Sequence, residues 1–137
     1  MDAELRQAII RRDGGGCVAR LANQRYSIEP DGGWPMLKGL PDPGPCRNAA
    51  GEVRSPFDAY NLTIDEIKMD APGEPGSHFR AGKRAGYSLG TCVTACVGHH
   101  VFGRGSGAQW TTKAVVRAAL RLYIPEANRR AGLIIPP

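Results

Sequence analysis

The stretch Cys96-Val-Gly-His99-His100 decides how this sequence is interpreted, because it places a thiol and an imidazole three positions apart. Thiolate and imidazole are both good zinc ligands, so a Cys-x-x-His pair can hold one edge of a tetrahedral site. Two further ligands are required, and Cys17 and Cys46 are the obvious donors. The sequence therefore predicts a Cys3His zinc site made by Cys17, Cys46, Cys96 and His99. The alternative is a core thiol beside two surface histidines.

The remaining cysteine, Cys92, stands four positions before Cys96. Its neighbours Leu89, Val93 and Ala95 are apolar, which favours burial of Cys92 as a small hydrophobic side chain over metal ligation.

The composition is that of a globular protein whose small core needs a metal ion or disulfides for stability. The chain has 137 residues, 18 basic and 13 acidic side chains, and a formal charge of +5. This length predicts one domain over 1–137, with a core over about 12–124 and a C-terminal tail over 125–137. Its 18 glycines and 11 prolines predict long loops around a small core, which a metal or disulfides must support.

The distribution of apolar residues along the chain bears on its cellular location. No apolar run approaches the roughly 20 residues that cross a bilayer, and the polar start Met1–Leu5 is unlike a secretory signal. We therefore expect a cytoplasmic protein with no membrane segment, in which a metal is favoured over disulfides. A disulfide-linked secreted protein is the alternative. The positive charge makes a polyanionic partner plausible.

Periodicity predicts one helix near each end of the chain. Residues 2–12 form the first helix, with Asp2 as its N-cap and Leu5 and Ile9 on its buried face. The last helix is capped by Thr111 or Thr112, runs to about residue 124, and is broken by Pro125. One face of this helix carries a basic residue at every fourth position: Lys113, Arg117 and Arg121. This face is either exposed to solvent or in contact with DNA.

The segment between the helices is expected to consist of loops and two strands. Residues 23–56 and 70–90 are loop-like. A strand is predicted over 60–68, with Leu62, Ile64 and Glu66 on one face and Thr63, Asp65 and Ile67 on the other. Residues 91–96 form a second short strand or turn, and Val97 opens a short helix that glycines 103–107 end.

The pair Asp65-Glu66 places two carboxylates at the end of the first strand. Neighbouring strand residues point to opposite sides, so the two carboxylates cannot bind one ion together unless the strand ends or twists there. One of them can bind a hard cation while the other accepts a proton. A solvated strand end is the alternative.

Several of these motifs follow one another in a characteristic order. Arg12-Asp13-Gly14 leads into Cys17-Val-Ala-Arg20, followed by Leu62-Thr-Ile-Asp-Glu-Ile-Lys68 and then Cys96-Val-Gly-His-His100. Gln109-Trp-Thr-Thr112 and a helix over 116–123 close the series. The chain thereby resembles the HNH endonuclease family, and looks closest to small HNH proteins of actinobacteria and their phages.

The resemblance implies an α+β fold, a small zinc-stapled ββα-metal domain with flanking N- and C-terminal helices and long loops. It assigns Cys96 and His99 to a structural zinc. It assigns Asp65 and His100 to a catalytic divalent cation, Mg²⁺ or Mn²⁺ or else Zn²⁺. Glu66 stands where the family has its general-base histidine, and Thr91 falls near the family's middle asparagine, so that match is lost. Glu66 is then a base, a second metal ligand, or the mark of a site that has lost catalysis.

The function implied by the resemblance is a metal-dependent DNA endonuclease or nickase. In this interpretation Asp65, Glu66 and His100 are catalytic, and DNA is the partner, contacted mainly through its backbone. Flanking phosphates are expected to meet Arg80, Lys83, Arg84 and Arg104, for which ordinary surface charge is the alternative. The competing function is a catalytically inactive, zinc-stapled DNA-binding module on the same fold. A phage-encoded protein of this kind would act in the cytoplasm of a bacterial host.

Overall fold

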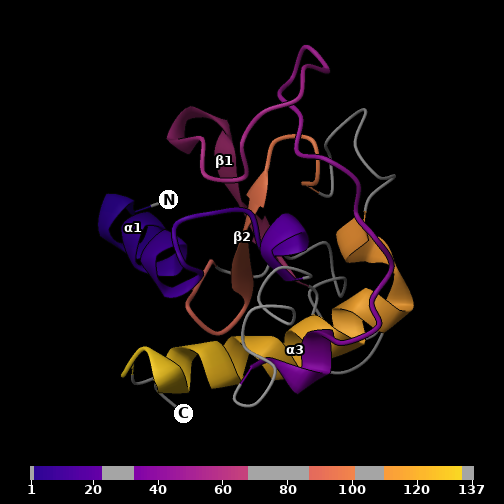
Figure 1. Ribbon diagram of the computed structural model, residues 1–137. Helices are drawn as coiled ribbons and strands as arrows, with labels where there is room; N and C mark the ends of the chain where they lie inside the picture. Colours follow the sequence, from indigo (N-terminus) through magenta and orange to yellow (C-terminus); the bar gives the residue numbers. More distant parts are fainter. Residues whose placement is uncertain (1, 23–32, 68–86, 101–109, 134–137) are drawn as a thin grey trace, which may run out of the picture.

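Two helices enclose a small antiparallel sheet. The computed structural model describes residues 2–22, 33–67, 87–100 and 110–133. Helix α1 lies to one side of the strands and α3 runs beneath them (Figure 1). In chain order the elements are α1 (Ala3–Arg12), the 3-10 helix η1 (Pro35–Leu37), the 3-10 helix η2 (Ala59–Asn61), β1 (Leu62–Glu66), β2 (Cys92–Cys96), the 3-10 helix η4 (Trp110–Thr112) and α3 (Ala114–Arg130).

The two strands pair over five residues. Alternation predicts the first strand, which is shorter than the expected 60–68 because residues 60 and 61 belong to η2, and residues 92–96 form a strand, one of the two alternatives for 91–96. Leu62 lies opposite Cys96 at one end, and Glu66 lies opposite Cys92 at the other. Ile64 and Cys92 pack with Ile9 of α1 on one face of the sheet. The opposite face, which carries Val93 and Ala95, packs into the larger core with the buried side of α3.

Helix α1 confirms the prediction for residues 2–12. Asp2 is the N-cap, and its Oδ1 accepts a hydrogen bond of 2.7 Å from the backbone N–H of Glu4. The apolar stripe faces the sheet, and Ile9 is completely buried. Basic Arg11 and Arg12 lie in the last turn, where they complement the negative end of the helix dipole.

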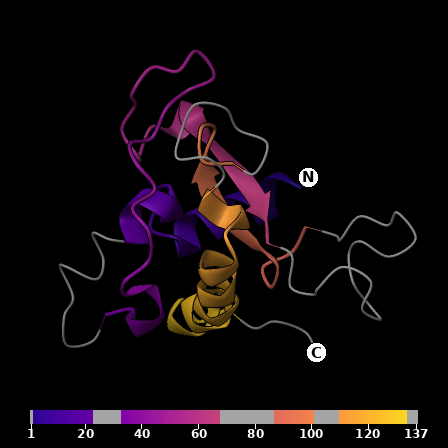
Figure 2. The ribbon, with the colours of Figure 1, turned by 90° about the vertical axis from the view of Figure 1, so that its right-hand side faces the viewer.

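The expected bounds of the last helix are wrong at both ends. Lys113 occupies the N-cap position, while Thr111 belongs to η4 and uses its hydroxyl elsewhere. Pro125 lies inside the helix, which continues to Arg130. Figure 2 looks nearly along this helix, which runs below the strands. Proline lacks one backbone N–H donor, but its ring is exposed here and buried side chains on both sides of it hold the helix in place.

The last turns of α3 therefore belong to the folded core, although a tail was expected from residue 125. Ala127 and Asn128 are buried. The Arg130 guanidinium lies 4.0 Å above the centre of the Trp34 ring and donates a hydrogen bond of 2.7 Å to the carbonyl of Gly33. No helix among the described residues is both long and apolar enough to cross a membrane.

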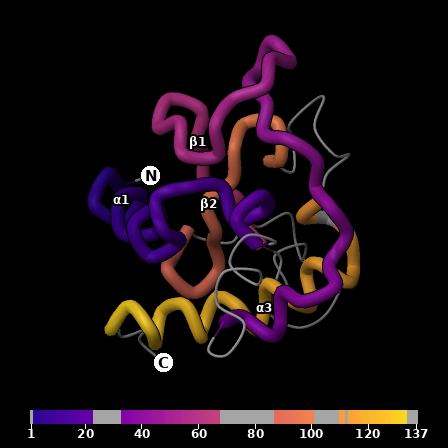
Figure 3. Tube along the Cα trace, in the orientation of Figure 1, coloured from indigo at the N-terminus to yellow at the C-terminus, as the bar shows by residue number. Residues whose placement is uncertain are grey.

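The segment between η1 and β1 is mostly irregular, as expected. It starts beside α3 and runs the height of the molecule before it reaches β1 (Figure 3). Two tryptophans hold η1 and the residues that follow it against the C-terminal part of the chain, η4 and α3. The ring of Trp34 packs 5.0 Å from that of Tyr123, and the indole N–H of Trp110 donates a hydrogen bond of 2.7 Å to the carbonyl of Pro41.

A buried ion pair joins α1, the sheet and α3. The Nε of Arg12 lies 2.9 Å from Oδ1 of Asp13, and both side chains are inaccessible to solvent. Arg12 also donates hydrogen bonds to the carbonyls of Leu89 and Cys92. The Oδ2 of Asp13 accepts a hydrogen bond of 2.8 Å from the backbone N–H of Thr94 in β2. Because both charges have several partners, their burial is compensated.

Candidate metal centre

Three sulfurs surround one imidazole nitrogen in the interior of the protein. The Nδ1 of His99 lies 3.6 Å from the Sγ of Cys17, 3.8 Å from that of Cys46 and 3.1 Å from that of Cys96. All four ligand atoms lie within 4.8 Å of one another, and all four residues are buried. Three thiolates and an imidazole match the donor set of a closed tetrahedral site. The cluster can therefore hold a metal ion such as zinc.

The His99 ring is oriented so that Nδ1 faces the sulfurs. Its Nε2 lies 2.8 Å from the carbonyl oxygen of Pro43. A carbonyl only accepts hydrogen bonds, so Nε2 carries a proton and donates it. In the neutral ring Nδ1 then has the lone pair that binds a metal, and such a second hydrogen bond is usual for metal-binding histidines.

Cys17 is held at the start of a helical turn. Its backbone N–H donates a hydrogen bond of 2.9 Å to the carbonyl of Pro56, and its own carbonyl accepts one from Leu21. Residues 18–22 are helical, which the sequence pattern did not predict. Gly16 is tightly enclosed just before this turn, because a Cβ atom there would lie 2.9 Å from the Pro56 carbonyl oxygen and from the Phe57 ring.

A tight turn after β2 brings Cys96 and His99 together. The backbone N–H groups of His99 and His100 both donate to the carbonyl of Cys96, and the His99 N–H also lies 3.3 Å from the Cys96 Sγ. The short helix expected from Val97 is therefore wrong over residues 97–100, which form a turn closed on Cys96. Residues 101–109 lie outside the described residues.

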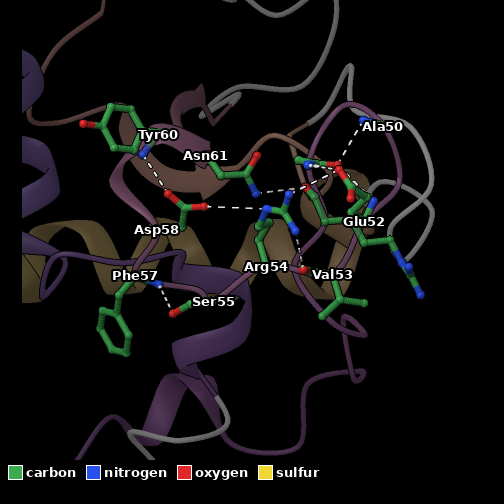
Figure 4. A network of polar contacts seen from close by, with 11 residues as sticks. Ala50, Glu52, Val53, Arg54, Ser55, Phe57, Asp58, Tyr60 and Asn61 are labelled. Carbon is green, nitrogen blue, oxygen red and sulfur yellow. Dashed lines mark hydrogen bonds and ion pairs between the residues drawn. The ribbon is translucent and has the colours of Figure 1, made fainter.

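The turn is tied to the loop that carries Cys46. The Arg47 carbonyl accepts hydrogen bonds of 3.0 Å from the N–H of Gly98 and from the side chain of Asn61. The Asn61 carbonyl accepts a further one from the N–H of Val97. The loop itself is braced by Arg54, whose guanidinium lies 3.2 Å from Glu52 and 4.0 Å from Asp58 (Figure 4).

The four ligands strongly perturb one another's protonation. Hydrogen bonds with Cys17 and then Cys46 lower the pKa of the Cys96 thiol, against the effect of burial. Hydrogen bonds with Cys17 and Cys96, and then burial, raise the pKa of the Cys46 thiol. Burial acts to lower the pKa of His99, but its bonds with the sulfurs of Cys17 and Cys96 raise it to about 10. Metal binding would displace the protons that these groups share.

Cys92 is excluded from the cluster, as its apolar neighbours predict. It is completely buried and packs with Ile9 and Ile64 between α1 and the sheet. Burial raises the pKa of its thiol, which keeps the thiol protonated and poorly suited to bind a metal.

Asp65 lies on the sheet face that meets the larger core. Its carboxylate is buried, and Oδ2 accepts a hydrogen bond of 2.8 Å from the hydroxyl of Thr111 in η4. This contact links the first strand to the turn before α3. Sequence reasoning considered Thr111 only as a helix cap, because nothing in the pattern shows which distant side chain its hydroxyl reaches.

His100 lies against the same strand. Its Nε2 is 3.1 Å from the carbonyl oxygen of Ile64, the residue that precedes Asp65. As for His99, a carbonyl acceptor at this position requires the proton to be on Nε2. Glu66 is partly exposed at the end of β1. Among the described residues, only the Cys3His cluster brings three or more potential ligand atoms together, so Asp65, Glu66 and His100 do not form a closed set.

The basic residues expected to contact phosphates can be placed only in part. Arg80, Lys83, Arg84 and Arg104 lie outside the described residues. Lys113 is exposed, and Arg117 and Arg121 are partly exposed along α3. The Arg12–Asp13 pair was not expected to be buried, because adjacent charges before three glycines are also typical of an ordinary helix end.

Comparison of the chain with protein-family models, curated proteins and solved structures finds no match.

Proposed function

We propose that this protein is a zinc-stabilised, metal-dependent DNA endonuclease or nickase of the HNH type. The observation that carries the proposal is the orientation of two consecutive histidines. His99 and His100 each donate Nε2–H to a backbone carbonyl, of Pro43 and Ile64 respectively. One imidazole is thereby directed into the Cys3His cluster, and the other is held at the residue before Asp65. The Cys3His cluster would hold a structural zinc ion, with no ligand position left for water.

The proposed catalytic residues are Asp65, Glu66 and His100. A carboxylate oxygen of Asp65 and Nδ1 of His100 suit a hard or borderline divalent cation, whose remaining ligands would be water and a phosphate oxygen. Such a cation supplies charge stabilisation for the scissile phosphate and the leaving oxygen. Glu66 takes the proton from the attacking water, a role open to a partly exposed carboxylate at the end of the strand.

Plasmid cleavage tests this proposal. Supercoiled plasmid is incubated with zinc-loaded protein and added Mg²⁺ or Mn²⁺, and nicked and linear products are separated on a gel. His100→Ala is expected to abolish cleavage while it keeps one zinc per chain. Glu66→Gln, which removes the base but keeps the side-chain shape, should slow cleavage about 10²- to 10⁴-fold. Absence of cleavage by folded, zinc-loaded wild type with every divalent ion tried would overturn the proposal.

A DNA-binding module without turnover is the second candidate. One observation favours it: the Asp65 carboxylate is 1% exposed and accepts the Thr111 hydroxyl, as a purely structural carboxylate would. In that case duplex DNA is retarded in a gel-shift assay, no divalent ion produces cleavage, and Asp65→Asn lowers stability without changing the DNA affinity. A nuclease instead loses cleavage in Asp65→Asn.

A further inference from the structure

Two aromatic rings are exposed on the segment between the Cys46 loop and β1. The side chain of Tyr60 is fully accessible to solvent, and that of Phe57 is 53% exposed. Both rings point away from the polar contacts that brace this segment (Figure 4). Burying a large apolar ring stabilises a protein, and these two rings remain exposed. A pair of exposed rings is therefore a candidate site of contact with a ligand.

The backbone beneath these rings is fixed by local hydrogen bonds. The N–H of Phe57 donates a hydrogen bond of 3.1 Å to the hydroxyl of Ser55, and the N–H of Tyr60 donates one of 3.0 Å to Oδ1 of Asp58. Asp58 is also paired with Arg54. The backbone of this segment is therefore already ordered, so a ligand that binds on the rings would cause little further loss of conformational entropy.

One side of Phe57 is packed against the start of the metal centre. A Cβ atom on Gly16 would lie 2.9 Å from Cδ1 of Phe57, so the ring edge rests on the chain just before Cys17. The remaining half of the ring faces solvent. The position of the ring is therefore set by the same turn that positions a ligand of the Cys3His cluster.

A cationic side chain is anchored to the start of β1, two residues after Tyr60. The Nη2 of Arg6 in α1 donates a hydrogen bond of 3.0 Å to the carbonyl of Leu62, two residues beyond Tyr60. Within the described part of the chain, no acidic side chain forms an ion pair with Arg6. A guanidinium held by one N–H keeps further donors in a planar arrangement that suits a phosphate group.

We propose that Arg6, Phe57 and Tyr60 form a binding surface for single-stranded nucleic acid. Bases stack on the rings of Tyr60 and Phe57, and Arg6 contacts a backbone phosphate. A single strand presents bases, which stack on aromatic rings, and phosphates, which attract positive charge. The two rings suit the bases, and Arg6 on a chain with a charge of +5 suits the phosphates. The inference deepens the proposed function by naming the form of the nucleic acid, but its test is independent of cleavage.

The test measures binding of a fluorescein-labelled oligothymidylate by fluorescence anisotropy, with zinc-loaded protein and no added Mg²⁺ or Mn²⁺. Tyr60→Ala is expected to weaken binding about 5- to 150-fold, because removal of one stacking ring has that effect. Tyr60→Phe should bind like wild type, whereas Tyr60→Leu should bind like Tyr60→Ala. Tyr87→Ala is the matched control, since Tyr87 is a half-exposed tyrosine near the far end of β2.

Arg6→Gln provides a second, independent measurement. It keeps a polar side chain but removes the charge, so the slope of log affinity against log salt should become shallower by about 0.7. Unchanged affinity in Tyr60→Ala overturns the inference. Full binding by Tyr60→Leu also overturns it, because any apolar contact, including one with a protein, would then suffice.

These outcomes are distinct from failure of the nuclease proposal. If wild type cleaves plasmid but the Tyr60 variants bind the oligonucleotide equally well, the surface is wrong and the nuclease stands. If the oligonucleotide binds through Tyr60 and no cleavage occurs, the surface is supported and the nuclease fails. Lack of any binding by wild type rejects the surface directly.

Discussion

The hydroxyl of Tyr123 in α3 donates a hydrogen bond of 2.8 Å to Oδ1 of Asp13 at the end of α1. Both side chains are fully buried. The Asp13 carboxylate also receives the guanidinium of Arg12 and the backbone N–H of Thr94. One aspartate therefore connects the first helix, the second strand and the last helix.

Tyr123→Phe is expected to lower the free energy of unfolding by about 1.5–3 kcal/mol, the usual range for a hydrogen bond to a charged group. The ring keeps its packing against Trp34, so the loss isolates the hydroxyl. Urea denaturation of the zinc-loaded protein measures the change. Tyr60→Phe serves as control, since Tyr60 is fully exposed and its hydroxyl should contribute nothing.

Arg12→Leu should destabilise the protein by about 3–5 kcal/mol, because it leaves the buried Asp13 carboxylate without its counter-charge. Arg11→Leu is the matched control: the neighbouring arginine is exposed, and its replacement should change stability by no more than about 0.5 kcal/mol. Equal effects of the two substitutions in denaturation experiments would show that the Arg12–Asp13 pair contributes nothing.

Removal of one cluster ligand is expected to release the metal and unfold the chain. Cys17→Ser should lose bound zinc, whereas Cys92→Ala should keep one zinc per chain, because Cys92 lies outside the cluster. Zinc content and circular dichroism of the purified variants measure both effects. Since a structural zinc contributes about 10–16 kcal/mol of binding free energy, a chelator should unfold the wild type. A chain that stays folded after complete zinc removal would contradict this.

Gly16→Ala should cost about 1–3 kcal/mol and weaken zinc binding, because the new methyl group would push the Pro56 carbonyl and Phe57 away from Cys17. Gly39→Ala is the control. It introduces strain at a positive φ of 74° but no close contact, and it lies away from the ligands, so stability should fall without a change in zinc affinity. Competition with a zinc indicator dye separates the two effects.

The parts of the fold that sequence reasoning predicted are those decided by local signals. The Asp2 cap and the Leu5–Ile9 stripe define α1, and alternation indicates β1. For β2 the sequence left a strand and a turn open, because all five of its residues are buried and show no alternation. The four candidate metal ligands were predicted from their chemistry instead of from periodicity. Few side chains other than cysteine and histidine can make a zinc site, so the four candidates could be chosen without knowledge of the loops that bring them together.

The parts that were missed depend on contacts between distant segments. Pro125 stays in a helix because the side chains around it are buried, which overrides its local tendency to end one. The turn over residues 97–100 forms because Gly98 and Asn61 both reach the Arg47 carbonyl. The Thr111–Asp65 hydrogen bond joins residues 46 positions apart, and no local pattern encodes it.

The order of the metal ligands along the chain has a consequence for synthesis on the ribosome. Cys17 and Cys46 leave the exit tunnel early, but the cluster cannot close until Cys96 and His99 have followed. Helix α3, which covers the sheet, emerges later still. We therefore expect the nascent chain to stay protease-sensitive until α3 has emerged, with metal capture and helix docking as successive events. Pulse proteolysis of ribosome-stalled chains of increasing length would display that order.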